Sequence, residues 1–248
     1  MKLIFITDVH ANLPALRAAV AAIHREGYDL LIHGGDAIAI GPFPKECLEV
    51  LFALPRIDFI MGNHDRYFSH GLPVPQPRYM SDGEVEHQHW THAQLDPELR
   101  AVIARWPYRI VEDFAGTEAT FVHYPLTASG ENFTQLIRDP AASDMENLFS
   151  QYPSERSALF FYGHNHNFSD LQGTARYVNP GSLGCAAGPV ARYTVVEFDH
   201  GAYRLEHRSV PYDDRELFDA FESRRVPERG FIYRAFLGGR FQSPSENG

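Results

Sequence analysis

The first sixty residues alternate between short apolar runs and segments with helical periodicity. Three apolar runs are typical of buried strands: KLIFIT (2–7), LLIH (30–33) and IDFIM (57–61). Two segments between them carry apolar residues at helical spacing, residues 13–23 and residues 44–54. Asn12 is placed to cap the first of these helices. This alternation predicts parallel strands joined by right-handed crossovers.

The pattern changes after residue 66. Residues 66–92 contain three prolines and the run EVEHQHWTH with little periodicity, which indicates an irregular excursion over the strand ends. Helices are expected at 97–105, 133–152 and 213–224. Strands are expected at YRIVEDF, EATFVH, ALFFYG, ARYVNP, RYTVVEFD and AYRLEHRSV, with hairpins at Ala115-Gly116 and at His200-Gly201.

The whole chain, 1–248, is expected to form a single domain. Within it, residues at about 66–106 form a lid-like excursion over the site, the helix at about 213–224 packs on the edge, and the tail after Pro244 is disordered.

Composition narrows the class of protein. The chain has 248 residues, of which 44% are hydrophobic and 22% charged, and this balance suits a globular protein. Its formal net charge of −10 does not favour extended nucleic-acid binding. No apolar run approaches the roughly 20 residues of a membrane span, and the first run meets Asp8 at once, so a cytoplasmic protein without a signal peptide is expected. Cys47 and Cys185 are expected to be idle thiols in that compartment.

Polar motifs follow five of the apolar runs. They are Asp8-Val9-His10, Gly35-Asp36, Gly62-Asn63-His64-Asp65, His123 and Gly163-His164-Asn165-His166. Ligands of open α/β sheets bind beyond the carboxyl ends of the strands, so these motifs are expected to converge there. Their Asp, His and Asn side chains suit Mn, Fe, Zn or Ni. They are too many for one tetrahedral ion and fit two ions that share a carboxylate, roughly 3.5–4 Å apart.

The ordered pattern D-x-H, G-D, G-N-H-D, H, G-H-x-H resembles the calcineurin-like metallophosphoesterase superfamily. The longer motifs D-x-H-x-N-L-x-A-L at residue 8 and N-P-G-S at residue 179 resemble its small bacterial and archaeal phosphodiesterase branch, which includes YfcE-type proteins. The resemblance runs from residue 1 to about residue 200. It implies a four-layer α/β sandwich, in which two mixed β-sheets lie face to face between outer helices.

The resemblance also implies a role for each motif residue. The first metal ion would be held by Asp8, His10 and His166, and the second by Asn63, His123 and His164. Asp36 would bridge both ions, whose identity stays open among Mn, Fe, Zn and Ni. His64 would stabilise the phosphoryl group or protonate the leaving oxygen, and Asp65 would orient its ring. The implied reaction is hydrolysis of a phosphodiester by a metal-bridging hydroxide.

The substrate is not legible beyond a small phosphorylated compound such as a nucleotide. Asn12 and Arg66 are candidate substrate contacts, although Asn12 also suits a helix cap. For the three histidines of the excursion, His87, His89 and His92, a polar lid, a substrate contact and a metal site are open alternatives. Two alternative functions also stand: a nucleotide pyrophosphohydrolase of the dinucleoside polyphosphate type, and a non-catalytic scaffold of the same fold, as in the retromer subunit.

Two positions depart from the pattern of the resemblance. Asn165 stands where Thr is usual, which puts an outer hydrogen bond in doubt rather than a ligand. After NPGSLG the chain continues with Cys185-Ala-Ala-Gly, where a more polar stretch is common, and this puts substrate contacts in doubt.

Overall fold

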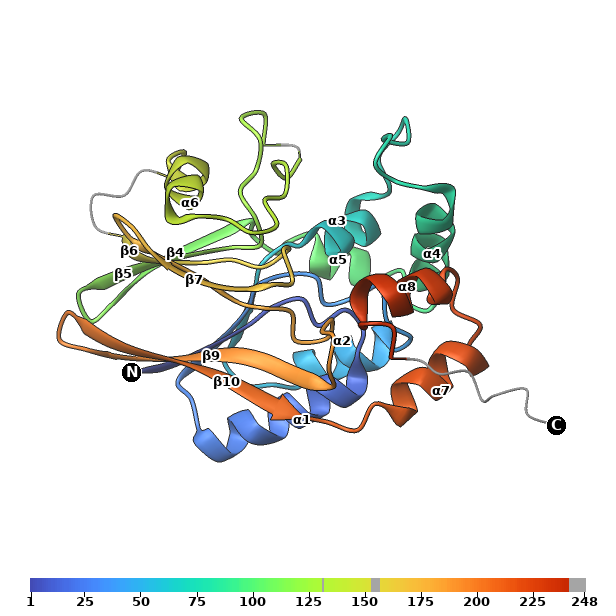
Figure 1. The fold of residues 1–248 in the computed structure, drawn as a ribbon, viewed down its shortest axis with the longest axis horizontal. Coiled ribbons are helices and arrows are strands. Elements are labelled where there is room, and N and C mark those ends of the chain that lie inside the picture. Colours follow the sequence, from blue (N-terminus) through green and yellow to red (C-terminus); the bar gives the residue numbers. More distant parts are fainter. Residues whose placement is uncertain (131, 153–156, 241–248) are drawn as a thin grey trace.

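The computed structural model describes residues 1–130, 132–152 and 157–240 (Figure 1). Its strands form two mixed five-stranded sheets. In the first sheet the order is β10 (Ala202–Pro211), β9 (Val190–Asp199), β1 (Lys2–Ile6), β2 (Leu30–His33) and β3 (Ile57–Phe59). In the second it is β4 (Arg109–Phe114), β5 (Thr117–Val122), β6 (Ser157–Phe161), β8 (Arg176–Pro180) and β7 (Phe168–Gln172).

Each sheet has a parallel centre with antiparallel additions. In the first sheet β1, β2 and β3 run parallel, whereas β9 and β10 are antiparallel to their neighbours. In the second sheet β5, β6 and β8 run parallel, whereas β4 and β7 are antiparallel. The predicted hairpins at Ala115-Gly116 and His200-Gly201 are confirmed.

The two sheets pack face to face because alternate residues of a strand point to opposite sides. Leu3 and Phe5 of β1 belong to a buried cluster that also contains Phe121 and Phe161 of the second sheet. Ile4 and Ile6 point the other way, into a cluster shared with helices. The predicted sandwich of two mixed sheets flanked by helices is therefore confirmed.

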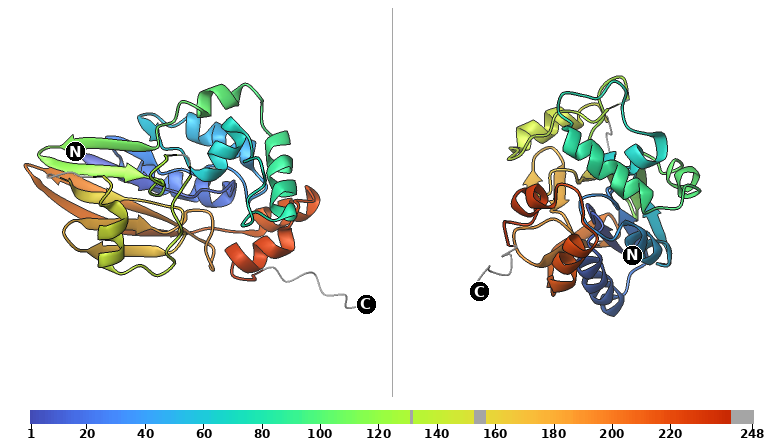
Figure 2. Two further views of the ribbon diagram at one scale, coloured as in Figure 1. Left: turned by 90° about the horizontal axis from the view of Figure 1, so that it is seen from above. Right: turned by 90° about the vertical axis from the view of Figure 1, so that its right-hand side faces the viewer.

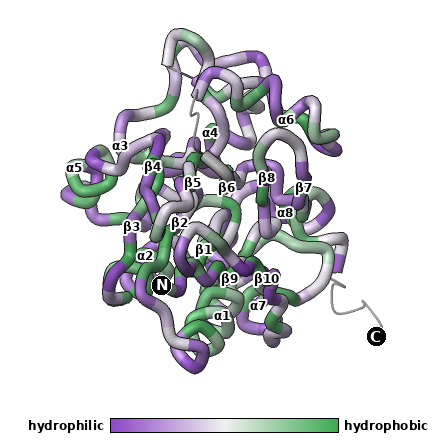
Figure 3. Tube along the Cα trace, turned by 90° about the vertical axis from the view of Figure 1, so that its left-hand side faces the viewer, coloured by the Kyte–Doolittle hydropathy of each residue, from purple (hydrophilic) through white to green (hydrophobic). Residues whose placement is uncertain are grey.

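Helices cover both outer faces (Figure 2). The first sheet packs against α1 (Leu13–Glu26) and α2 (Pro44–Phe52), and Figure 3 shows apolar residues along both helices. Helix α7 (Arg215–Ser223) contacts α1. The second sheet packs against α6 (Ala142–Phe149). Four further helices gather at the end of the sandwich opposite the N-terminus (Figure 1): α3 (Asn63–His70), α4 (Asp82–Ala93), α5 (Leu99–Ile103) and α8 (Arg229–Phe236).

The expectation of an irregular segment through residue 92 was wrong, because residues 82–93 form helix α4. Ser81 caps this helix by accepting a hydrogen bond from the Glu84 N–H, 3.1 Å away. The buried residues of α4 are His87, Gln88 and Thr91. Since this inner face is polar, hydrophobic periodicity could not reveal the helix.

Other boundaries also differ from expectation. The helix expected at 133–152 is confined to α6, and Pro140 lies just before it. The C-terminal helix is shorter by a few residues and is followed by α8, while β7 was not expected. The tail after Pro244 lies outside the described residues. No helix among residues 1–130, 132–152 and 157–240 is long and apolar enough to cross a membrane.

Candidate metal centre

The motif-bearing loops meet at one edge of the sandwich and are joined by backbone hydrogen bonds. The Asp8 N–H donates to the Gly35 carbonyl at 3.0 Å, and the Gly163 N–H donates to the His123 carbonyl at 2.8 Å. The Gly184 N–H donates to the carbonyl of Asp8 at 3.0 Å, which ties the NPGSLG segment to the first loop. The predicted convergence of the strand ends is thus seen in the structure.

Several of the candidate ligands have a left-handed backbone. The φ angles are 54° at Asp8, 47° at His10, 57° at Asp36, 66° at His164 and 60° at His166. Non-glycine residues adopt positive φ uncommonly, and such residues cluster at functional sites where the surrounding fold holds them. The loops therefore place these side chains at some conformational cost.

Two glycines let the backbone approach the carboxylates closely. A Cβ atom at Gly62 would lie 2.2 Å from Oδ1 of Asp36, and one at Gly163 would lie 2.5 Å from Oδ2 of Asp8. Any larger residue would displace the carboxylate it faces. The glycines of the G-N-H-D and G-H-x-H motifs thus leave room for the candidate ligands.

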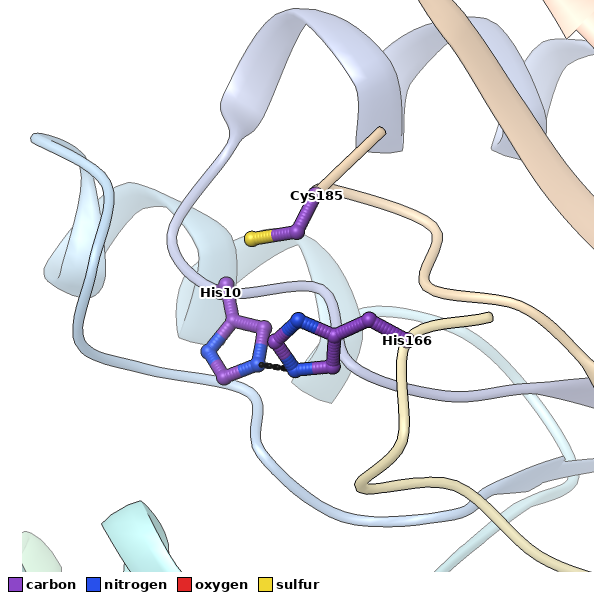
Figure 4. A group of neighbouring side chains, drawn as sticks. All are labelled: His10, His166 and Cys185. Carbon is purple, nitrogen blue, oxygen red and sulfur yellow. Dashed lines mark hydrogen bonds between the residues drawn. The ribbon is translucent and has the colours of Figure 1, made fainter. Parts of the chain in front are cut away.

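A first group of donors consists of Asp8, His10 and His166. Nε2 of His166 lies 3.4 Å from Oδ1 of Asp8, and Nε2 of His10 lies 3.6 Å from the same oxygen. The two histidine Nε2 atoms face each other at 2.8 Å (Figure 4). Atoms at these distances converge on a common point, as the ligands of a metal ion do.

A second group consists of Asn63, His123 and His164 around Asp36. Nε2 of His123 lies 3.2 Å from Oδ1 of Asn63 and 3.2 Å from Oδ2 of Asp36. Ligand atoms of Asp36, His123 and His164 all lie within 4.8 Å of one another. Oδ2 of Asp36 is also 3.8 Å from Nε2 of His10, so this carboxylate lies between the two groups.

Two of the histidines are oriented as metal ligands usually are. Nδ1 of His123 donates to the Gly34 carbonyl at 2.9 Å, and Nδ1 of His10 faces the Ile38 carbonyl at 3.3 Å. A carbonyl only accepts, so Nδ1 of each ring carries a proton and Nε2 is the atom that faces the carboxylates. Burial lowers the pKa of His123, but Asp36 outweighs it and raises the pKa to about 9, so a cation that binds Nε2 of His123 would displace a proton.

The electrostatics of the site also fit divalent cations. Asp8 and Asp36 are buried, and in the described part of the chain their ion pairs are formed with histidines alone. Burial raises the pKa of each carboxyl, but the neighbouring histidines hold both pKa values well below their usual range. Buried anions are costly unless they are paired or coordinate a metal. The donor set therefore suits two cations that share Asp36.

His64 lies beside both groups and is held by helix α4. One ring nitrogen lies within 4.8 Å of ligand atoms of His10 and Asp36. Nδ1 accepts a hydrogen bond from Nε2 of Gln88 at 2.6 Å, which places the ring proton on the other nitrogen. Burial lowers the pKa of His64 to about 3, although Asp36 opposes that shift, so the ring is neutral.

The prediction that Asp65 orients His64 was wrong in this structure. The Asp65 carboxylate accepts hydrogen bonds from the backbone N–H groups of Asp36, Ala37 and Gly62, at 2.7, 3.1 and 3.2 Å. Burial and the adjacent Asp36 carboxylate raise the pKa of Asp65. Asp65 therefore fixes the loop that carries Asp36, and the Gln88 side chain forms a hydrogen bond with the His64 ring.

Residues 1–201 match the model of the calcineurin-like phosphoesterase superfamily domain. The chain belongs to this superfamily. The recognition made from the motifs is confirmed, and a family of phosphoesterases that typically binds divalent metals accords with the donor groups found here.

Related proteins extend over nearly the whole chain. An uncharacterised protein of Methanocaldococcus jannaschii is 25% identical over 253 residues, covering 94% of this chain and 96% of its own length. A hypothetical protein of Pyrococcus horikoshii has a similar structure, with a TM-score of 0.79, 21% identity and coverage of 97% and 99% of the two chains. A metallophosphoesterase of Sphaerobacter thermophilus follows, with a TM-score of 0.70, 24% identity and coverage of 94% and 98%.

Within this calcineurin-like domain, the Asn12 side chain forms hydrogen bonds that stabilise the fold. Its Oδ1 accepts from the Ala15 N–H at 3.1 Å, which confirms the predicted helix cap. Its Nδ2 donates to the Gly184 carbonyl at 2.8 Å and to the Tyr212 hydroxyl at 2.9 Å. A substrate contact by Asn12 stays a prediction, and it would require these bonds to open.

Arg66 is better placed to reach a substrate. It is half-buried and lines a cavity of about 750 Å³ together with Asn63 and His164. No hydrogen bond or ion pair of its guanidinium is found within the described ranges, so its charge is available to an anion.

The two departures from the family pattern have distinct surroundings. Nδ2 of Asn165 donates to the carbonyls of Ile137 and Arg138, both at 2.9 Å, and so anchors the G-H-x-H loop. Cys185 is buried beside the first donor group, and its Sγ lies within 4.8 Å of ligand atoms of His10 and His166 (Figure 4). Sequence reasoning treated this thiol as idle and did not place it at the centre.

The three histidines of α4 separate into different environments. His87 is buried, where it accepts from the Ile40 N–H at 2.8 Å and donates to the Pro227 carbonyl at 3.2 Å. His92 packs edge-on against Phe68, with 5.4 Å between ring centroids, and His89 is exposed. His87 thus links two loops of the fold through the hydrogen bonds of its ring.

Proposed function

We propose that this chain is a phosphoesterase that hydrolyses phosphodiester bonds with the help of two divalent cations. The observation that carries the proposal is the sharing of Asp36 between two donor groups, with His64 adjacent to both. A single structural metal ion would need neither the second group nor a neutral histidine beside it.

The chain's own residues have separable tasks in this reaction. When bound, divalent cations lower the pKa of water and neutralise phosphate oxygens. Asp8, Asp36, Asn63 and the four histidines of the two groups would hold these cations. His64, which is neutral and carries its proton on the nitrogen that faces away from Gln88, would donate a hydrogen bond to the leaving oxygen and so stabilise its developing negative charge. Arg66 would attract the anionic substrate.

A metal and turnover assay tests the proposal. The purified protein should bind two manganese ions per chain and should hydrolyse bis-p-nitrophenyl phosphate. A parallel panel of p-nitrophenyl phosphate and a dinucleoside polyphosphate separates diester, monoester and pyrophosphate preference, and faster cleavage of the polyphosphate would favour a pyrophosphohydrolase. Absence of both metal and turnover would favour a scaffold.

Removal of metal should also lower stability, which is measurable without any substrate. A ligand that binds only the folded state stabilises it by about 2.7 kcal/mol at roughly 100 times its Kd. For a chain of this size, roughly 2–4 °C of Tm accompanies each kcal/mol, so chelation is expected to lower Tm by roughly 5–10 °C. Calorimetry before chelation, after it and after return of manganese measures this shift. An unchanged Tm would contradict cation binding at these buried groups.

A further inference from the structure

A cavity of about 530 Å³ opens beside His64, between helices α4 and α8. We name it the α4–α8 pocket. Its lining includes Ile40, His64, Tyr79, Gln88, Phe231 and Phe236. The two helices lie side by side at the end of the sandwich that faces the viewer in the right panel of Figure 2. A volume of this size falls in the range of small-molecule sites, roughly 300–1,000 Å³.

The pocket is held in shape by contacts that the catalytic proposal does not use. The His87 ring joins the loop after β2 to the segment before α8, through its bonds to Ile40 and Pro227. Gly83 of α4 lets the Glu228 side chain pass closely, since a Cβ there would lie 2.5 Å from Cδ of Glu228. The wall formed by α8 is therefore fixed against α4.

The wall formed by α8 comes from outside the matched domain. The superfamily model covers residues 1–201, whereas α8 spans Arg229–Phe236. Phe236 also packs against the His166 ring, with 5.6 Å between centroids. A segment beyond the phosphoesterase domain thus reaches the metal centre and shapes the space next to it.

The lining of the pocket combines apolar and aromatic side chains with polar ones, two of which are carboxylates. Phe231 is 53% exposed although it is a large apolar side chain, and it lies beside Phe236 with ring centroids 6.0 Å apart. Glu84 and Glu228 are the acidic residues of the lining, and none of the described residues that line it is Lys or Arg. The adjoining cavity of about 750 Å³ shares Tyr79 and Glu84 but contains Arg66.

We propose that the α4–α8 pocket binds a planar aromatic substituent of the phosphoester, such as a nucleobase. This inference rests on the proposed function, because a phosphoryl group held at the centre would direct its substituent past His64. The aromatic walls would stack on a ring. The carboxylates would accept hydrogen bonds from amino or hydroxyl groups and would repel a second negative charge. A second anionic group of the substrate would instead lie in the adjoining cavity that contains Arg66.

Binding of simple phosphate monoesters tests the proposal without requiring turnover. Titration calorimetry on the manganese-loaded protein would compare phenyl phosphate with methyl phosphate. The apolar area of the ring predicts a preference of about tenfold for the phenyl ester. Phe231→Ala is expected to reduce that preference to below about threefold and to leave the Kd of methyl phosphate unchanged. Phe231→Tyr should keep the preference.

A matched control removes a phenyl ring elsewhere. Phe52 of α2 is 38% exposed and contacts Phe59 and Trp106, and Phe52→Ala should leave the preference intact. A negatively charged ligand tests the role of the two carboxylates separately. 4-Carboxyphenyl phosphate should lose most of the advantage of the ring, and Glu228→Gln should restore part of it.

The outcomes separate this proposal from the proposed function. A phenyl preference that Phe231→Ala does not change would overturn the pocket assignment, even if diesters are hydrolysed. Equal affinities for phenyl and methyl phosphate in the unmodified chain would overturn it as well. A preference that depends on Phe231, in a protein without turnover, would support the pocket and reject the phosphodiesterase.

Discussion

Replacing Asp36 with asparagine is expected to reduce turnover of bis-p-nitrophenyl phosphate by at least about a thousandfold. Metal ions contribute several kcal/mol of transition-state stabilisation, and each 1.36 kcal/mol is a factor of about ten. Asn retains the shape of Asp, and its Oδ1 can still accept the hydrogen bond that the backbone N–H of His64 donates at 2.9 Å. It lacks the second anionic oxygen that two cations would share.

The metal content of Asp36→Asn should fall to at most one ion per chain. Inductively coupled plasma mass spectrometry and steady-state kinetics measure the two effects on the same sample. Asp58→Asn, an exposed position on β3, is the matched control and should keep both ions and full turnover. Two tightly bound ions in Asp36→Asn would show that this carboxylate does not bridge them.

Replacing His64 with alanine is expected to reduce kcat by about a hundredfold to a thousandfold, the usual loss when a hydrogen-bond donor to developing charge is removed. Unlike the Asp36 variant, it should retain both metal ions, because His64 is held by Gln88 and is not counted among the ligands. The loss should be larger for diphenyl phosphate than for bis-p-nitrophenyl phosphate, since a poorer leaving group holds more negative charge on its oxygen and depends more on the hydrogen bond.

The control for His64 is His89→Ala, which removes an exposed imidazole from α4. It should behave like the unmodified chain with both substrates. Equal losses for the two leaving groups in His64→Ala would indicate that the ring does not contact the leaving oxygen. Loss of metal in that variant would make His64 a ligand, and the assignment of its role would then be wrong.

Much of the fold follows from local patterns in the sequence. Apolar runs such as KLIFIT become buried strands because their side chains alternate between two hydrophobic clusters, one on each face of the sheet. The hairpin at His200-Gly201 and the cap at Asn12 are local features that a few residues determine. The order of the motifs along the chain was enough to recognise the superfamily.

Tertiary context explains what the sequence did not reveal. Helix α4 buries the polar side chains of His87 and Gln88, so it lacks an apolar stripe. A helix start could have been read from Ser81 and Glu84, which have the spacing of a capping box. The contact between Gln88 and His64 joins residues 24 apart and depends on how α4 packs, as does the approach of α8 to the centre.

The left-handed backbone at the candidate ligands was also beyond reach of pattern analysis. Asp and His adopt a positive φ more often than most residues, but residue type alone does not predict it at Asp8, His10 and Asp36. Backbone bonds between loops distant in sequence impose this conformation, such as that from the His10 N–H to the Asp36 carbonyl at 3.0 Å. The types of the candidate ligands could be predicted from the sequence, but their geometry could not.

Anomalous diffraction from a manganese-soaked crystal would test the central idea most directly. We expect two peaks roughly 3.5–4 Å apart, one beside Asp8 and His166, the other beside Asn63 and His123, with the Asp36 carboxylate between them. One peak, or two peaks with Asp36 turned away from either, would contradict the shared-carboxylate centre on which the proposed reaction depends.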